Sequence, residues 1–494
     1  MGADSSANTP LWITVILIVV DIVVKVVALG LVPERRRPSS ATAWLLLIFF
    51  LPYVGIASFL LIGSPFVDRK RRRRQNAAGE LVRQSLAPVP TVDSGPDIPA
   101  WLGSAVRLNR RLGWLPDVGG NDARLFGDYT GSIEAMAAEV DAAERYVHAA
   151  FYILSWDSTT ERFFQALVDA VERGVTVRLL FDHIGTLRIP GYRSMLARLD
   201  GTGIEWHPML PVQPLRGKWQ RPDLRNHRKI LVVDGRAAFV GSQNMIDPSY
   251  HNKAHERAGR RWQDLMVRVA GPVVTSLDIV FATDWFLETR QDLRPELQPE
   301  LRPEAFPPPS GDTLCQVVPS GPGFPDENNL RLFNTLIYGA ERRLSITSPY
   351  FIPDDSLLYA ITTAAQRGVA VELFVCEQGD QFMVDHAQHS YYTALLEAGV
   401  RIYLYPAPAV LHAKHLSVDD TVAVIGSSNM DVRSFQLDFE VCLMCVGNRF
   451  VTDLRAVEDD YRARSRELTL AQWRARALPK RYLDNVMRLT SAVQ

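Results

Sequence analysis

Two long apolar runs stand out in the pattern of hydrophobic and polar positions along the chain. They cover residues 11–32 and 43–62, and each is long enough to cross a hydrocarbon core of about 30 Å as a helix. Asp21 and Lys25 lie one helical turn apart in the first run, so they can pair and lower the cost of two charges at mid-depth. A cleaved signal peptide is the alternative for that run, but no basic segment precedes it and a second run follows. The pattern predicts two transmembrane helices.

Basic residues near the two runs indicate an orientation. None precede the first run, three arginines occupy 35–37 between the runs, and the basic cluster 69–74 follows the second. Because positive residues are enriched on the cytoplasmic side, the larger cluster predicts that both termini are cytoplasmic, although the three arginines argue the other way. We therefore expect a two-span protein of the cell membrane, with the bilayer as a partner and the rest of the chain in the cytoplasm.

Beyond residue 123 the pattern changes to short apolar strands that alternate with amphipathic helices, and it does so twice. Ala143-Glu144-Arg145 leads into an apolar run, as Ala340-Glu341-Arg342 does, and residues 173–180 match residues 367–374. This repeat predicts an α/β fold of two tandem domains related by a pseudo-twofold axis and preceded by two transmembrane helices. The expected units are a membrane anchor at 1–75, a linker at 76–123, a first domain at 124–290, a Pro-rich linker at 291–311, and a second domain with a basic C-terminal helix at 312–494.

Composition adds two limits to this picture. Lys and Arg number 54 and Asp and Glu 55, so the charge balance gives no reason to expect nucleic acid as a partner. Of the four cysteines, the one close pair, Cys442 and Cys445, lies in an apolar run, which predicts buried thiols rather than a metal or redox pair. Nothing in the spacing of the four indicates a disulfide framework, which fits a reducing compartment.

A short motif occurs late in each half. Both copies read H-x-K-x4-D, and each is followed at the same spacing by a glycine and an asparagine. One such match arises easily by chance, but two copies at equivalent places of a repeat do not. The candidate catalytic residues are His227, Lys229, Asp234, His412, Lys414 and Asp419, and the candidate phosphate-binding amides are Asn244 and Asn429.

The chemistry of these residue types points to a phosphate diester. His and Lys two positions apart on a strand face the same way, so two facing halves offer two imidazoles, two ammonium groups and two amides to one pocket. Such a pocket requires no metal or other cofactor to neutralise phosphoryl oxygens. One histidine can attack phosphorus, while the other protonates the leaving alcohol and then deprotonates the incoming one.

Each histidine also needs a carboxylate that fixes its tautomer. Asp264 and Glu440 are the candidates, because they occupy equivalent places after the two motifs. Asp234 and Asp419 are expected to fix the turn after the motif strand, since four intervening residues carry them away from the histidine face.

The paired motifs, within about 124–494, resemble the phospholipase D superfamily. Segments 226–229, 348–354 and 426–435, together with the two N-terminal apolar runs, resemble bacterial cardiolipin synthases. The resemblance implies transfer of a phosphatidyl group from one phosphatidylglycerol to another through a phosphohistidine, with release of glycerol. It also implies His227 as the nucleophile and His412 as the acid/base, or the reverse. A membrane phospholipase D that yields phosphatidic acid is the alternative, followed by a nuclease, and the oligomeric state stays open.

The chain departs from the family pattern at a few positions. Ser242 stands where a second glycine is usual, and Asp438 replaces a common asparagine before Glu440, which leaves the choice of acceptor and headgroup open. Four further histidines could line the pocket entrance, although lone histidines are more often ordinary surface or core residues: His148, His183, His386 and His389.

Overall fold

The computed structural model describes residues 11–34, 38–63, 73–77, 79, 99–213, 220–293, 307–324 and 326–490. The chain divides into two compact units. The first comprises Met1–Arg69 with Gln220–Asp223, and the second comprises Lys70–Trp219 with Leu224–Gln494.

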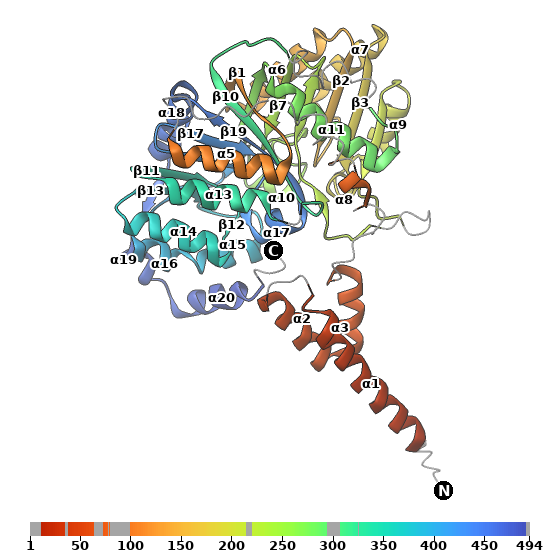
Figure 1. Cartoon of the computed structure of the whole chain (residues 1–494), viewed down its shortest axis with the longest axis vertical. Coiled ribbons are helices and arrows are strands. Elements are labelled where there is room, and N and C mark those ends of the chain that lie inside the picture. The colour runs from red at the N-terminus through yellow and green to blue at the C-terminus, as the bar shows by residue number, and fades with distance from the viewer. Residues whose placement is uncertain are drawn as a thin grey trace. The chain divides into compact units, whose positions relative to one another are not determined.

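The first unit contains the long helix α1 (Leu11–Leu31), labelled in Figure 1. Its apolar side chains are largely exposed. Within it, Trp12–Leu31 is the one stretch of the described residues that is both long and apolar enough to cross a membrane as a helix. The predicted pair is present, because Lys25 Nζ lies 2.6 Å from Asp21 Oδ2.

The second apolar run does not form one continuous helix. It is divided into α2 (Pro38–Phe50), α3 (Pro52–Ser58) and the π-turn η1 (Phe59–Gly63). Proline removes a helical hydrogen bond and clashes with the preceding turn, so the chain breaks between Phe50 and Pro52. A Cβ on Gly55 would lie 2.6 Å from Ile48 Cα, whereas residues seven apart in a straight helix are about 10 Å apart. The run therefore turns sharply at Leu51, and the predicted second spanning helix is not confirmed.

A sixteen-stranded sheet forms the centre of the second unit (Figure 1). Fifteen strands follow one another in order, and the sixteenth, β5 (Arg225–Asn226), pairs with one of them outside that order. From the middle outwards, the first half contributes β1 (Asp117–Phe126), β9 (Met266–Ala270), β7 (Ala237–Gly241), β6 (Ile230–Val233), β2 (Tyr146–Phe151), β3 (Thr176–Asp182) and β4 (Glu205–Met209). The second half contributes β10 (Thr313–Ser320), β19 (Asp438–Val446), β17 (Val422–Gly426), β16 (His415–Val418), β11 (Arg343–Thr347), β13 (Ala370–Cys376), β14 (Arg401–Tyr405) and β20 (Arg466–Leu468).

The two halves have the same strand order and meet at an antiparallel pair of equivalent strands. Val118 of β1 lies opposite Cys315 of β10 in this central pair. Antiparallel pairing of equivalent strands relates the halves by an approximate twofold axis. The α/β class and the internal repeat predicted from the sequence are therefore present.

Helices cover this sheet, whose inner strands are buried along their whole length, as expected for strands packed on both faces. The first half has α6 (Tyr129–Asp141), α7 (Glu161–Glu172), α8 (His183–Leu187), α9 (Tyr192–Asp200), α10 (Lys253–Arg257) and α11 (Val273–Thr289). The second has α13 (Asn328–Gly339), α14 (Asp355–Gln366), α15 (Phe382–His389), α16 (Tyr392–Ala398), α17 (Val432–Gln436), α18 (Asn448–Arg464), α19 (Leu470–Arg474) and α20 (Leu478–Arg488). Helix α5 (Ala100–Gly113) precedes all of these in the chain and packs against β10 and α13 of the second half. All four cysteines are buried and free, which includes the predicted buried pair Cys442 and Cys445.

Three short strand pairs lie outside the regular order of the sheet. They join β5 (Arg225–Asn226) to β19, β15 (Val410–Leu411) to β8 (Trp262–Gln263), and β12 (Phe351–Ile352) to β18 (Met430–Asp431). The first two connect the halves to each other. They position the residues of the two motifs.

Candidate active site

Each motif histidine is held by a strand of the opposite half. β5 runs parallel to the start of β19, and the amide of His227 donates to the carbonyl oxygen of Phe439 at 2.9 Å. In the same way β15 runs parallel to β8, and the amide of His412 donates to the carbonyl oxygen of Gln263 at 2.7 Å. In both cases the next residue of the holding strand is the carboxylate that the sequence singles out. The backbone therefore brings each histidine to an acid of the other half.

The two carboxylates contact the two histidines in this crossed arrangement. His412 Nδ1 lies 2.6 Å from Asp264 Oδ1. His227 Nδ1 lies 3.1 Å and 3.2 Å from the two oxygens of Glu440 and 3.0 Å from the carbonyl oxygen of Ser427. An acceptor at Nδ1 holds the ring proton there and leaves Nε2 of the neutral imidazole with a free lone pair.

The motif lysines are fully buried beside their histidines. Lys229 Nζ donates to the carbonyl oxygen of His227 at 2.6 Å, and Lys414 Nζ donates to that of His412 at 2.7 Å. Burial, followed by repulsion from Lys414, lowers the pKa of Lys229 to about 7. Burial likewise lowers the pKa of Lys414 to about 8. An anion between the two ammonium groups would oppose both shifts, so the site favours a negatively charged ligand.

The histidines and their carboxylates titrate differently in the two pairs. Burial and the charge of Lys414 lower the pKa of His412 to about 4, and burial lowers the pKa of His227 well below its usual value. Burial raises the pKa of Glu440 to about 7. Burial is the strongest effect on Asp264 and acts to raise its pKa, but His412, Lys414 and Ser242 together outweigh burial, and the net pKa is below the usual value. At neutral pH the site thus holds neutral imidazoles and an ionised Asp264.

The two predicted amides have different surroundings. Asn244 Oδ1 accepts from the amide of Ile153 at 3.1 Å, and its Nδ2 donates to Tyr250 at 2.9 Å. Asn429 Oδ1 is buried without a hydrogen-bond partner among the described residues. The side-chain oxygen of Asn244 is therefore engaged in a hydrogen bond of the fold, whereas that of Asn429 is not.

Asp234 and Asp419 bind backbone rather than the histidines. Asp234 accepts from the amides of residues 144–146 at 2.8–2.9 Å, and Asp419 accepts from those of residues 341–343 at 2.8–3.2 Å. Each carboxylate thereby joins the turn after its motif strand to the start of the neighbouring strand. This is the turn-fixing role that the sequence predicts.

Three serines that the sequence analysis did not select hold the carboxylates in place. Ser242 Oγ donates to Asp264 Oδ1 at 2.6 Å, while Glu440 accepts from Ser427 and, at 2.8 Å, from Ser434. Ser242 and Ser427 each follow the glycine that the two motif copies share. Their equivalence in the repeat is the signal that would have identified them.

Comparison with known proteins agrees with this arrangement. A family model described as "Cardiolipin synthase, PLD-like domain" matches residues 136–285 and 333–459. Cardiolipin synthase A of Pectobacterium carotovorum subsp. carotovorum (strain PC1) is 35% identical over 463 residues, covering 93% of this chain and 94% of the relative. Cardiolipin synthase A of Yersinia pestis is 35% identical over 466 residues, with the same coverage.

A solved structure shares the fold. Phosphatidylserine synthase of Haemophilus influenzae Rd KW20 superposes with a TM-score of 0.59 at 14% identity, covering 80% of this chain and all of the other. The family match spans both halves, and the relatives align over nearly their whole length. The chain therefore belongs to the cardiolipin synthase family and carries its phospholipase D-like domain in two copies.

Proposed function

We propose that this protein is a cardiolipin synthase that transfers a phosphatidyl group from one phosphatidylglycerol to another and releases glycerol. The observation that carries the proposal is the crossed pair of histidine–carboxylate contacts beside two buried lysines. Two imidazoles with free Nε2 atoms suit a two-step displacement at phosphorus, and the lysines favour an anionic diester.

The first step forms a phosphohistidine. The anionic diester binds with His412 protonated on both ring nitrogens. Nε2 of His227 then attacks phosphorus, the bond from phosphorus to the glycerol oxygen breaks, and His412 gives its Nε2 proton to that oxygen. His412 suits the acid/base role because the ionised Asp264, 2.6 Å from its Nδ1, stabilises the imidazolium form. Substrate charge acts in the same direction, since an anionic diester favours protonation of both His412 and the lysines.

The second step returns the site to its starting state. The neutral His412 takes the proton of an acceptor hydroxyl on a second phosphatidylglycerol, whose oxygen bonds to phosphorus while the bond to His227 breaks. Lys229, Lys414, Asn244 and Asn429 contribute charge and amide donors to the phosphoryl oxygens in both steps. Glu440 orients His227, as Asp264 orients His412.

Product analysis tests this reaction. The purified chain is incubated in vesicles of labelled phosphatidylglycerol, and cardiolipin and glycerol should appear in equal amounts, with phosphatidic acid a minor product. Excess glycerol should drive the reaction backwards, because the phosphohistidine accepts either alcohol. Dominant phosphatidic acid would identify a membrane phospholipase D instead, and cleavage of oligonucleotides alone would identify a nuclease.

We also propose the finer membrane arrangement, with two spans, cytoplasmic catalytic domains and the domain boundaries predicted above. Helix α1 and the basic cluster 69–74 support it. The break at Pro52 suggests a specific alternative. In it, the second apolar run enters the membrane and leaves it on the same side. Reporter tags at both termini decide between them: cytoplasmic signals from both support two spans, and opposite signals support one.

A further inference from the structure

The C-terminal helix α20 is docked through a carboxylate. Among its residues Leu478–Arg488, all of which the structure describes, Asp484 is the one buried side chain, with 3% exposure. A surface helix normally docks through an apolar stripe, and a buried carboxylate requires charged or hydrogen-bonding partners. The partners of Asp484 therefore decide how α20 is held.

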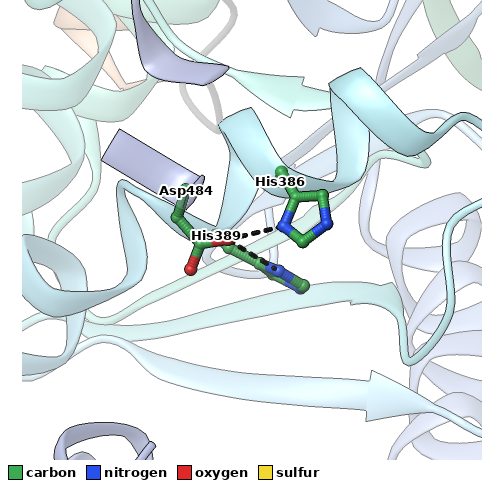
Figure 2. A group of neighbouring side chains, drawn as sticks. All are labelled: His386, His389 and Asp484. Atoms are coloured by element: carbon green, nitrogen blue, oxygen red, sulfur yellow. Dashed lines mark hydrogen bonds and ion pairs between the residues drawn. The ribbon is translucent and has the colours of Figure 1, made fainter. Parts of the chain in front are cut away.

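Two of these partners are histidines on α15. His386 and His389 are three positions apart and so lie on one face of that helix. His386 Nδ1 is 2.7 Å from Asp484 Oδ1, and His389 Nδ1 is 3.8 Å from the same oxygen. Figure 2 shows the two rings and the carboxylate turned toward one another from the two helices. One ligand atom from each residue lies within 4.8 Å of the others.

We propose that His386, His389 and Asp484 bind a zinc ion, with a water molecule as fourth ligand. Two imidazole nitrogens with one carboxylate suit zinc, whereas magnesium and calcium prefer oxygen ligands. Zinc bonds of about 2.0–2.1 Å in a tetrahedron place ligand atoms about 3.4 Å apart. The observed separations of 2.7 Å and 3.8 Å lie on either side of that value, so small side-chain shifts complete the site.

Residues around the cluster supply the supporting contacts of a metal site. Arg476 donates to Asp484 Oδ2 at 2.7 Å, which leaves Oδ1 directed at the histidines. Asp385 Oδ1 accepts from the amide of Gly379 at 3.1 Å and lies 3.8 Å from Nε2 of His389, the ring nitrogen away from Asp484, so a shift of the side chain is needed before the two form a hydrogen bond. A carboxylate behind a ligating histidine fixes its tautomer and raises its basicity. The histidine side chains keep 18–19% exposure, which gives a water ligand access.

The zinc ion would hold α20 against α15 rather than take part in catalysis. None of its ligands belongs to the two motifs, and they join segments separated by almost a hundred residues of chain. Met487 of α20 also packs against the hydrophobic core, so the ion would add to an apolar contact that already holds the helix. The site is independent of the proposed transfer reaction.

Zinc stoichiometry of the purified full-length chain tests the proposal. After incubation with zinc and removal of free metal, the wild type should retain one zinc per chain, with two imidazole nitrogens in its X-ray absorption spectrum. Asp484→Asn and the double variant His386→Ala/His389→Ala should lose it, and Asp385→Asn should weaken binding by about 10- to 100-fold. His207→Ala, which alters an exposed histidine on β4, is the matched control and should retain the zinc.

Two further measurements separate this site from the catalytic one. His227→Asn should keep its zinc, and zinc should slow tryptic cleavage at Lys480 and Arg481 in the wild type but not in Asp484→Asn. The proposal would be wrong if zinc remained bound to Asp484→Asn or did not bind to the wild type. The three side chains would then form only a hydrogen-bonded contact. Loss of transferase activity alone would affect the proposed function and leave the zinc result intact.

Discussion

At the scale of single residues, substitution of the two histidines should affect turnover more than substitution of their two carboxylates. We expect His227→Asn and His412→Asn each to abolish turnover, because a nucleophile or proton donor has no substitute. Asp264→Asn and Glu440→Gln should retain measurable activity, reduced by about 10²- to 10⁴-fold, since an orienting group changes only tautomer and pKa. The measurement is cardiolipin formation from phosphatidylglycerol, with His207→Asn as control. Near-native turnover in a folded histidine variant would contradict the two-histidine mechanism.

The buried lysines make ligand binding depend on pH. Their pKa values of about 7 and about 8 rise when an anion binds, so the site takes up protons on binding. Affinity should be highest below pH 7 and should fall as pH rises through 8, by about tenfold per unit for each lysine that must be protonated.

Sulfate is a suitable probe, because it remains a dianion over this range. Its affinity, measured by calorimetry between pH 6.5 and 9, should show that fall, and Lys414→Gln should make the slope shallower. Affinity that does not change with pH would mean that the lysines do not face the anion.

At the scale of strands and helices, the glycine of each motif copy controls where the carboxylate lies. A Cβ on Gly426 would lie 2.2 Å from the carbonyl oxygen of Val441, the residue after Glu440, and a Cβ on Gly241 would lie 2.3 Å from that of Leu265, after Asp264. Gly426→Ala should therefore lower the free energy of unfolding by about 1–3 kcal/mol and reduce turnover, because the strand bearing Glu440 must move. Thermal unfolding in detergent and initial rates measure the two effects.

Gly103→Ala in α5 is the matched control. Its Cβ would meet only the Arg107 guanidinium at 3.5 Å, and alanine favours a helix, so stability should be unchanged or slightly raised. Equal losses in both variants would show that the close approach at Gly426 is not what matters.

The sequence predicts the helices, strands and site residues better than it predicts that each histidine contacts the carboxylate of the other half. Periodicity and repetition indicate the two domains, the motif residues and both orienting acids. They do not indicate that Glu440 reaches His227 rather than His412, because this follows from two-residue strand pairs between distant segments. Apolar length likewise predicts a second span over 43–62, whereas Pro52 and the close approach at Gly55 break that run.

At the scale of the whole molecule, the proposed membrane anchor and the proposed phosphohistidine would together decide the product. The chain joins an apolar N-terminal helix to the catalytic domains, so the intermediate would form beside a surface crowded with lipid headgroups. Water and a second phosphatidylglycerol then compete for the same phosphorus. Because the water concentration is constant, the ratio of cardiolipin to phosphatidic acid should follow the surface concentration of the acceptor lipid.

Surface dilution tests this competition in the intact protein. In mixed micelles of phosphatidylglycerol with an uncharged detergent, lowering the lipid mole fraction tenfold should lower the cardiolipin to phosphatidic acid ratio by about tenfold. The His227→Asn variant, incubated in the same micelles, gives the background level of both products. A ratio that stays constant over the dilution would mean that the acceptor is already bound when the donor is cleaved. Transfer would then depend on a second lipid site within the catalytic domains, and crowding at the membrane surface would not explain it.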